Sequence, residues 1–267
     1  MIAPKDLLDL TGKVAVITGA GSGIGQGSAQ LLAAAGGKIV CGDLDPVRLK
    51  TTLTSIDDAG GEAIGVEVDT TSQASVDALV QRAVDEYGRL DVMGNIAGII
   101  HDASVLDTTE ADFDRVLAVN LKGVLFGCQA AARVMKEQGS GSIINMSSGA
   151  IDMPSPNLVS YAVSKAGVAQ LTKTLATEMG SSGVRVNAIA PGIVMTNMTT
   201  RHFTAPDGTV NEAARDGLVN AMTRSLPLSR MGEPEDIARS VLFLASEASS
   251  YMTGQILRPN GGVAMPW

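Results

Sequence analysis

The sequence contains few cysteines and histidines, the residues that build disulfide frameworks and many metal sites. Its 267 residues include two of each. Cys41 lies in an apolar run and Cys128 in a helical pattern, so we expect both to be core residues in a reducing compartment. His101 and His202 are each isolated. We therefore expect neither a disulfide framework nor a metal site.

Positive charge and long hydrophobic runs are also scarce. The formal net charge of −8 would repel nucleic acids and anionic membranes, so neither is expected as a partner and a small molecule is more natural. The opening MIAPKDLLDL has acidic residues where a signal peptide needs an apolar core. No run approaches the about 18 apolar residues of a membrane span. These features predict a cytoplasmic protein.

Short β-branched runs alternate with longer segments of helical period along the whole chain. This alternation predicts right-handed βαβ units. We therefore expect one α/β domain over residues 1–267, a doubly wound parallel sheet of the Rossmann type with helices on both faces. The predicted strands are 13–18, 38–43, 63–68, 90–95, 141–147 and 184–190, and the predicted helices are 23–35, 46–59, 73–88, 110–138 and 160–180. Residues 192–232 break the alternation and are expected to form a mobile lobe over the site.

A glycine-rich turn follows the first predicted strand. The stretch TGAGSGIGQG, residues 18–27, lacks G-x-G-x-x-G but contains T-G-x-x-x-G-x-G. Such a turn lets backbone N–H groups and the dipole of the next helix approach a pyrophosphate, although glycines can also form a simple tight turn.

An acidic residue ends the second predicted strand. Asp43 lies 18 residues beyond Gly25, close to the spacing at which a carboxylate bonds an adenosine ribose. The carboxylate would repel a 2′-phosphate, and residues 20–24 and 44–47 contain no arginine or lysine, with Arg48 the nearest. These features favour NAD(H). The alternative is that Asp43 is an ordinary turn residue at a strand end.

The segment SYAVSKAG, residues 160–167, places a phenol and an ammonium four positions apart. If the segment is helical, Tyr161 and Lys165 share one face of the helix. On these two residues alone, a surface helix with a packed tyrosine and a solvated lysine is the favoured interpretation, so the rest of the chain must decide.

Together with further motifs, the glycine-rich turn and the YAVSK segment make the chain resemble the short-chain dehydrogenases/reductases, in their branch of about 250 residues. The resemblance extends over nearly the whole length of the chain. Two departures are visible: Ile96 stands where members often have a second asparagine, and Pro259-Asn260 stands where they often have Val-Asp. The matching elements are TGAGSGIG at 18–25, Asp69, NIAG at 95–98, VNLKG at 119–123, NMSS at 145–148, YAVSK at 161–165, PGIVMT at 191–196, GEPEDIARSVLFLAS and YMTGQILRPNGG.

The resemblance implies catalytic roles for four residues. Tyr161 would exchange a proton with the substrate oxygen while a hydride passes between substrate carbon and nicotinamide, and Lys165 would bond the nicotinamide ribose. Lowering a phenol pKa towards neutrality needs about 3 to 4 kcal/mol, and a unit charge ~4 Å away at an effective dielectric of ~20 supplies about 4 kcal/mol. We therefore expect Lys165 to lower the Tyr161 pKa.

The other two residues implied by the resemblance leave alternatives open. Ser148 would hold the substrate oxygen, with its neighbour Ser147 as the competing assignment. Asn120 would support a water chain to Lys165, or else make only a local backbone bond.

The resemblance also implies an NAD-binding set and a homotetramer. Family members commonly pair the helices matching 110–138 and 160–180 across one two-fold axis, and the C-terminal helix and strand across another. The cofactor-binding residues would be Gly19, Ser22, Gly23, Ile24, Gly25, Asp43, Leu44, Asp69, Thr70, Asn95, Ala97, Gly98, Tyr161, Lys165, Pro191, Gly192, Val194 and Thr196.

The expected function is an NAD(H)-dependent oxidoreductase that interconverts a secondary alcohol and a ketone, with Tyr161 as acid/base. The alternatives are an NADPH-dependent 3-oxoacyl-thioester reductase and a cofactor-binding sensor without turnover.

Apolar residues in and near the lobe predict a mainly apolar substrate, unless they only fill the lobe's own core. They are Met195, Met198, Phe203, Leu218, Met222, Leu226, Ile151, Met153 and Leu158. If Arg201, His202 or Arg224 faces inward, an anionic substrate is expected instead.

Overall fold

Seven strands form one parallel sheet in the order β3-β2-β1-β4-β5-β6-β7. The computed structural model describes residues 6–201, 203–205, 207–224 and 226–266. The central strands are rich in buried apolar and β-branched residues because both faces of the sheet are covered by helices. The strands are β1 Val14–Thr18, β2 Lys38–Asp43, β3 Glu62–Glu67, β4 Val92–Asn95, β5 Gly141–Met146, β6 Val184–Ile189 and β7 Ile256–Leu257.

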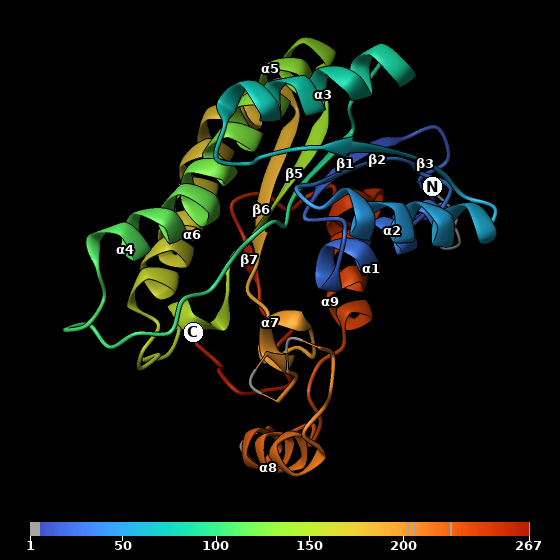
Figure 1. The fold of residues 1–267 in the computed structure, drawn as a ribbon. Helices are drawn as coiled ribbons and strands as arrows, with labels where there is room; N and C mark the ends of the chain where they lie inside the picture. Colours follow the sequence, from blue (N-terminus) through green and yellow to red (C-terminus); the bar gives the residue numbers. More distant parts are fainter. Residues whose placement is uncertain (1–5, 202, 206, 225, 267) are drawn as a thin grey trace.

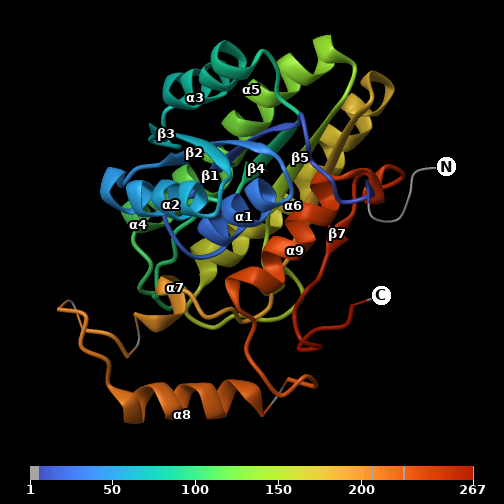
Figure 2. The same ribbon diagram turned by 90° about the vertical axis from the view of Figure 1, so that its right-hand side faces the viewer.

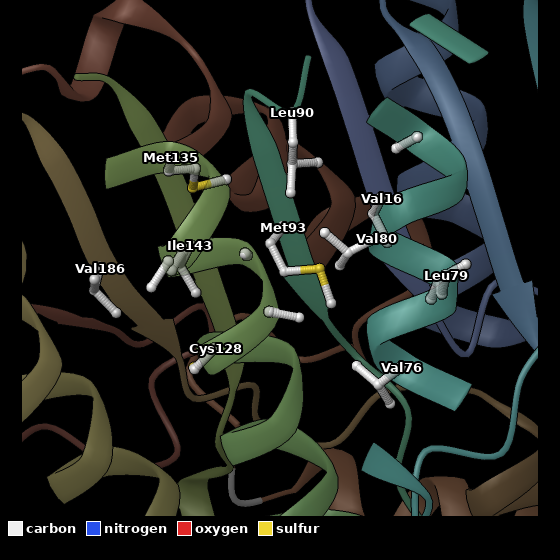
Figure 3. Close-up of a cluster of buried hydrophobic side chains, with 14 of the residues drawn as sticks. Val16, Val76, Leu79, Val80, Leu90, Met93, Cys128, Met135, Ile143 and Val186 are labelled. Atoms are coloured by element: carbon white, nitrogen blue, oxygen red, sulfur yellow. The ribbon is translucent and has the colours of Figure 1, made fainter. Parts of the chain in front are cut away.

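Two layers of helices enclose the sheet (Figures 1 and 2). One layer holds α1 Gly23–Ala34, α2 Pro46–Asp58 and α9 Pro234–Ala245, which pack their apolar sides on one buried cluster. The other holds α3 Gln73–Tyr87, α5 Gly123–Gln138 and α6 Val159–Met179. Figure 3 shows Val76, Leu79 and Val80 along α3 and Met93 on β4, all members of the buried cluster on this face of the sheet. The predicted fold class is therefore confirmed.

The six strands predicted from periodicity are present, with ends that differ by at most two residues. β7 extends the sheet beside β6, with Ala188 opposite Ile256. The predicted helix over 110–138 is interrupted. It consists of α4 Glu110–Leu117, a π-helical turn over Ala118–Lys122, and α5. Hydrophobic period alone does not reveal this turn, because one widened turn barely changes which residues face the core.

The carboxyl ends of the strands gather at one edge of the sheet, where β2 and β4 lie on opposite sides of β1. This reversal of strand order makes a crevice for ligands in doubly wound sheets. The segment after β6 contains the short helix α7 Asn197–Thr200 and helix α8 Glu212–Thr223. Both lie towards this edge, and α8 projects from the rest of the chain (Figures 1 and 2). No residue of α8 is buried.

Candidate active site

The glycine-rich turn brings the backbones after β1 and β4 into contact. Gly19 has φ +69°, and a Cβ there would lie 2.8 Å from the Cα of Ala97. A Cβ on Gly25, in the first turn of α1, would lie 2.0 Å from the Gly19 carbonyl oxygen. The Thr18 hydroxyl accepts hydrogen bonds from the Ala97 and Ile96 N–H groups at 3.2 and 3.0 Å. The close approach leaves the N-terminus of α1 facing the crevice, as a pyrophosphate requires.

Asp43 holds the glycine turn from the end of β2. Its Oδ2 accepts from the Gly21 N–H at 2.8 Å, and its Oδ1 accepts from the Asp45 N–H at 3.0 Å. The next residue, Leu44, is 65% exposed. Arg48 lies beside the turn, but its Nε pairs with Asp45 Oδ2 at 3.2 Å. The charge that the chain places directly against the turn is therefore negative, which suits ribose hydroxyls better than a phosphate.

Asn95 does not present its side chain to the crevice. The side chain is buried, and its Nδ2 donates to Asn145 Oδ1 at 2.9 Å. Asn145 in turn donates to the Thr172 hydroxyl of α6 at 3.0 Å. The buried network between β4, β5 and α6 engages the Asn95 side chain, so the predicted contact of Asn95 with a cofactor would have to come from its backbone.

The π-helical turn holds Asn120 at the centre of the site. Its side chain is fully buried and bonds both backbone groups of Ile99, accepting from the N–H at 2.8 Å and donating to the carbonyl at 2.9 Å. Its Nδ2 also donates to the Ser164 hydroxyl on α6 at 3.2 Å. A Cβ on Gly98 would lie 3.3 Å from Asn120 Oδ1 and 3.5 Å from Lys165 Nζ. Asn120 therefore links α6 to the loop after β4 rather than making a local backbone bond.

The two adjacent serines after β5 face different surroundings. Ser147 is buried, and its hydroxyl donates to the Lys165 carbonyl at 3.0 Å. Ser148 accepts from the Ala150 N–H at 3.2 Å, and its hydroxyl bonds the Tyr161 phenol. The geometry thus brings Ser148, and not Ser147, to the phenol.

Burial shifts the pKa values of both Tyr161 and Lys165. The Lys165 ammonium is buried, donates to the Met146 carbonyl at 2.7 Å and lies 5.7 Å from the centre of the Tyr161 ring. Burial lowers the pKa of Lys165 to about 8. Burial raises the pKa of Tyr161, while the Ser148 hydrogen bond and the positive charge of Arg201 act in the opposite direction.

The structure of the chain alone therefore does not show the expected lowering of the Tyr161 pKa by Lys165. The Lys165 ammonium bonds a backbone carbonyl rather than the phenol oxygen, and desolvation lowers its own pKa. The positive charge of Arg201 lowers the pKa of Tyr161, although burial outweighs it. The sequence marked Arg201 only as one of three basic residues near the lobe; Arg224 is exposed, and His202 lies outside the described residues.

The remaining predicted cofactor residues lie after β3 and β6. Asp69 is exposed and accepts from the Thr71 N–H and hydroxyl at 2.8 and 2.7 Å, which closes the turn that carries Thr70. After β6, a Cβ on Gly192 would lie 2.7 Å from the Cα of Asn260, so the C-terminal segment packs directly on this turn. Pro191 and Val194 are buried, and Ser22, Gly23, Ile24 and Thr196 are partly exposed.

Two observations concern other classes of site. Within the described ranges, no three histidine, cysteine, aspartate or glutamate side chains lie close enough to hold a metal ion. Over the same residues, none of the helices has the length and apolar character needed to cross a membrane.

Comparison with known proteins identifies the family. A family model described as Enoyl-(Acyl carrier protein) reductase matches residues 19–264. The 3-oxoacyl-[acyl-carrier-protein] reductase of Thermotoga maritima is 39% identical over 96% of this chain and 99% of its own length. The chain belongs to the short-chain dehydrogenase/reductase family. It is therefore one of a family of oxidoreductases that bind nicotinamide cofactors.

Solved structures of this family match nearly the whole chain. A 7α-hydroxysteroid dehydrogenase complexed with NADH and 7-oxo glycochenodeoxycholic acid has a TM-score of 0.90 at 33% identity, and the match covers 99% of both chains. A protein from Agrobacterium tumefaciens, assigned as a 2-deoxy-d-gluconate 3-dehydrogenase and solved with bound NADP, has a TM-score of 0.84 at 35% identity, covering 97% of this chain and 98% of that one.

Replacing the buried lysine is expected to stabilise the fold at neutral pH. Between pH about 8 and the ordinary lysine value of 10.5, the unfolded chain binds more protons at Lys165, so the wild-type free energy of unfolding should rise with pH across this window. Below pH 8 the folded wild type carries the full cost of the buried ammonium. Lys165→Met should therefore raise the free energy of unfolding at pH 7 by about 1 to 3 kcal/mol, with a smaller gain at pH 10.

Urea unfolding of the cofactor-free chain at several pH values measures this effect. Lys173→Met is the matched control, because Lys173 lies on the same helix but is exposed. A Lys165→Met variant less stable than the wild type at pH 7 would contradict the expected cost of burial.

Proposed function

We propose that this protein is an NAD(H)-dependent oxidoreductase that interconverts a secondary alcohol and a ketone, with Tyr161 as acid/base. The observation that carries the proposal is the convergence of Ser148, Tyr161, Lys165 and Asn120 beside the glycine-rich turn at the carboxyl end of the sheet. A protein that only sensed a cofactor would not need a phenol, a serine hydroxyl and a buried ammonium at one point.

The contacts support a division of roles during alcohol oxidation. Ser148, bonded to the phenol, would hold the substrate oxygen next to Tyr161. Tyr161 would take the hydroxyl proton as the carbon loses its hydride, and would return a proton in the reverse direction. The bound nicotinamide would accept or supply the hydride. Lys165 would hold the nicotinamide ribose, and Asn120 would orient the backbone around Ile99 and carry protons away through water.

The proposed NAD site extends along the crevice from the glycine turn. Gly19, Gly23 and Gly25 keep the backbone open for the pyrophosphate, and Asp43 would accept hydrogen bonds from the adenosine ribose. Further contacts are proposed for Ser22, Ile24, Leu44, Asp69, Thr70, the Asn95 backbone, Ala97, Gly98, Pro191, Gly192, Val194 and Thr196.

A 3-oxoacyl-thioester reductase is the second candidate. It is favoured by the 39% identity with a protein named 3-oxoacyl-[acyl-carrier-protein] reductase. Asp43 at the glycine turn counts against the phosphate-carrying cofactor that this candidate would use. The two candidates share the same acid/base chemistry and differ in cofactor and in the size of the carbonyl substrate.

We further propose that residues 192–232 cover the substrate and that the chain works in the cytoplasm as one domain. The buried side chains of Phe203 and Leu226 support a small core within this lobe. Cys41 and Cys128 are free, buried thiols, which suits a reducing compartment.

Asp43→Asn is expected to narrow the preference between the two cofactors. In the wild type, NAD(H) should bind at least about tenfold more tightly than NADP(H), roughly 1.4 kcal/mol, because the carboxylate faces the 2′-phosphate. The amide keeps an acceptor for the Gly21 N–H but removes the charge. Calorimetry with both cofactors measures the ratio, and Asp58→Asn, at the exposed end of α2, controls for net charge. Equal binding of both cofactors by the wild type would refute the preference.

Tyr161→Phe is expected to lower kcat by at least about 100-fold while the affinity for NAD stays nearly constant, because only the transferable proton is removed. Tyr251→Phe is the control, since Tyr251 is fully exposed. A screen of secondary alcohols with NAD, read at the absorbance of the reduced nicotinamide, gives kcat, and fluorescence titration gives the affinity. Substantial turnover by Tyr161→Phe would assign the proton transfer to another group.

Resemblance to the family also leads us to propose a homotetramer. On α6, Val163 has 47% of its side chain exposed and Ala166 is exposed, which leaves a small-residue surface open to close packing. Light scattering at micromolar concentration should report about four times the 27.4 kDa of one chain. A mass of one chain would contradict the proposal.

A further inference from the structure

An ion pair joins the segment after β6 to the loop after β4. Arg201, the residue after α7, contacts Asp102, which lies 99 positions earlier in the chain. Arg201 Nη2 and Nε lie 2.7 and 3.3 Å from Asp102 Oδ2. Both contacts fall on one carboxylate oxygen, so the pair does not use the guanidinium's two-pronged geometry in full.

This ion pair lies beside the reacting groups. The neighbour of Asp102, Ala103, donates from its N–H to the Asn157 carbonyl at 2.9 Å and pairs with Leu158. Leu158 directly precedes α6, which carries Tyr161 in its first turn. The charge of Arg201 acts on the Tyr161 phenol. The loop that carries Asp102 thus lies against the start of α6, and Arg201 is close enough for its charge to act on the phenol.

Arg201 is also available for a ligand. Its side chain is 31% exposed and that of Asp102 is 46% exposed, and exposed pairs of this kind contribute about 0 to 1 kcal/mol. The other cations near Ser148 are committed. Arg258 contacts both oxygens of Asp152, at 2.7 and 3.1 Å, and the Lys165 ammonium bonds Met146. In the described part of the chain, Arg201 is thus the cation at the phenol with donors to spare.

We propose that Arg201 receives a carboxylate of the substrate, so that the substrates are secondary-hydroxy acids and the corresponding oxo acids. This inference rests on the proposed function and names its substrate class. With a net charge of −8, the protein as a whole repels an anion, so recognition of a carboxylate needs a local cation. A substrate carboxylate would replace Asp102 or share the guanidinium with it, and would thereby orient the hydroxyl-bearing carbon towards Tyr161.

The test compares matched alcohols that differ only in charge. The probes are hydroxy acids of four to ten carbons with the hydroxyl on the penultimate carbon, their methyl esters, and the 2-alkanols of equal length, each assayed with NAD. At the best chain length, the acid should exceed its ester in kcat/KM by about 10- to 100-fold. Its KM should rise with ionic strength.

Three variants separate recognition from a purely structural ion pair. Arg201→Gln should bring the acid-to-ester ratio of kcat/KM down to about one. The ratio is the readout because loss of the Arg201 charge also acts on Tyr161, and therefore on both substrates. Asp102→Asn should keep or increase the preference, because it frees the guanidinium. Arg224→Gln, in the same segment but exposed, is the matched control. Calorimetry of NAD binding to each variant verifies that the cofactor site is intact.

The outcomes distinguish this inference from the proposed function. Turnover of esters and alkanols as fast as acids would overturn the role of Arg201 while leaving the oxidoreductase proposal standing. An acid preference that survives Arg201→Gln would likewise overturn it. An equal loss of the acid preference in Asp102→Asn and Arg201→Gln would also overturn it, because the ion pair would then have a purely structural role. If no alcohol in the three series reduces NAD, the proposed function fails and this inference fails with it.

Discussion

The burial of the Lys165 ammonium is the constraint on which the surrounding structure depends. A charged amine away from water costs several kcal/mol unless polar groups replace its hydration. In the described chain one backbone carbonyl, that of Met146, accepts a hydrogen bond from it. Asn120 lies close by, held by Ile99 and by Ser164 of α6. The fold thus keeps a buried lysine at some cost in stability, which is the pattern expected if Lys165 has the proposed role.

The second constraint is the contact of backbones where the strand order reverses. Gly19 touches Ala97, so the loops after β1 and β4 cannot separate without opening the crevice. The Thr18 hydroxyl, at the end of β1, accepts hydrogen bonds from two backbone N–H groups of the loop after β4 and so holds the two loops together. The loop after β4 continues to Gly98 and Ile99, and Ile99 is bonded to Asn120. The glycine-rich turn and the hydrogen bonds of Asn120 are therefore connected through this loop. The geometry of the proposed hydride transfer therefore derives from close packing rather than from long side chains reaching across a gap.

Sequence patterns predicted most of this arrangement and failed where the outcome depends on three-dimensional neighbours. Buried strands and glycine turns have local signals, namely apolar runs and residues able to take a positive φ. The π-helical turn at Asn120 has no such signal, because it arises from the bonds to Ile99 and α6. Asn95 occupies the expected position, but its side-chain direction is decided by Asn145. The Tyr161 pKa depends on burial and on Arg201, which lies 40 positions away in the sequence.

Two arginine–aspartate pairs lie beside the site and differ in how far their aspartates are exposed to water. Asp152 has only 8% of its side chain exposed, so removing Arg258 would leave an uncompensated buried charge. That pair fixes the segment after Ser148 against β7. Asp102 is 46% exposed, so water can solvate it when its arginine turns away. The Arg258–Asp152 pair is therefore the more costly of the two to break, whereas the Arg201–Asp102 pair can separate at little cost.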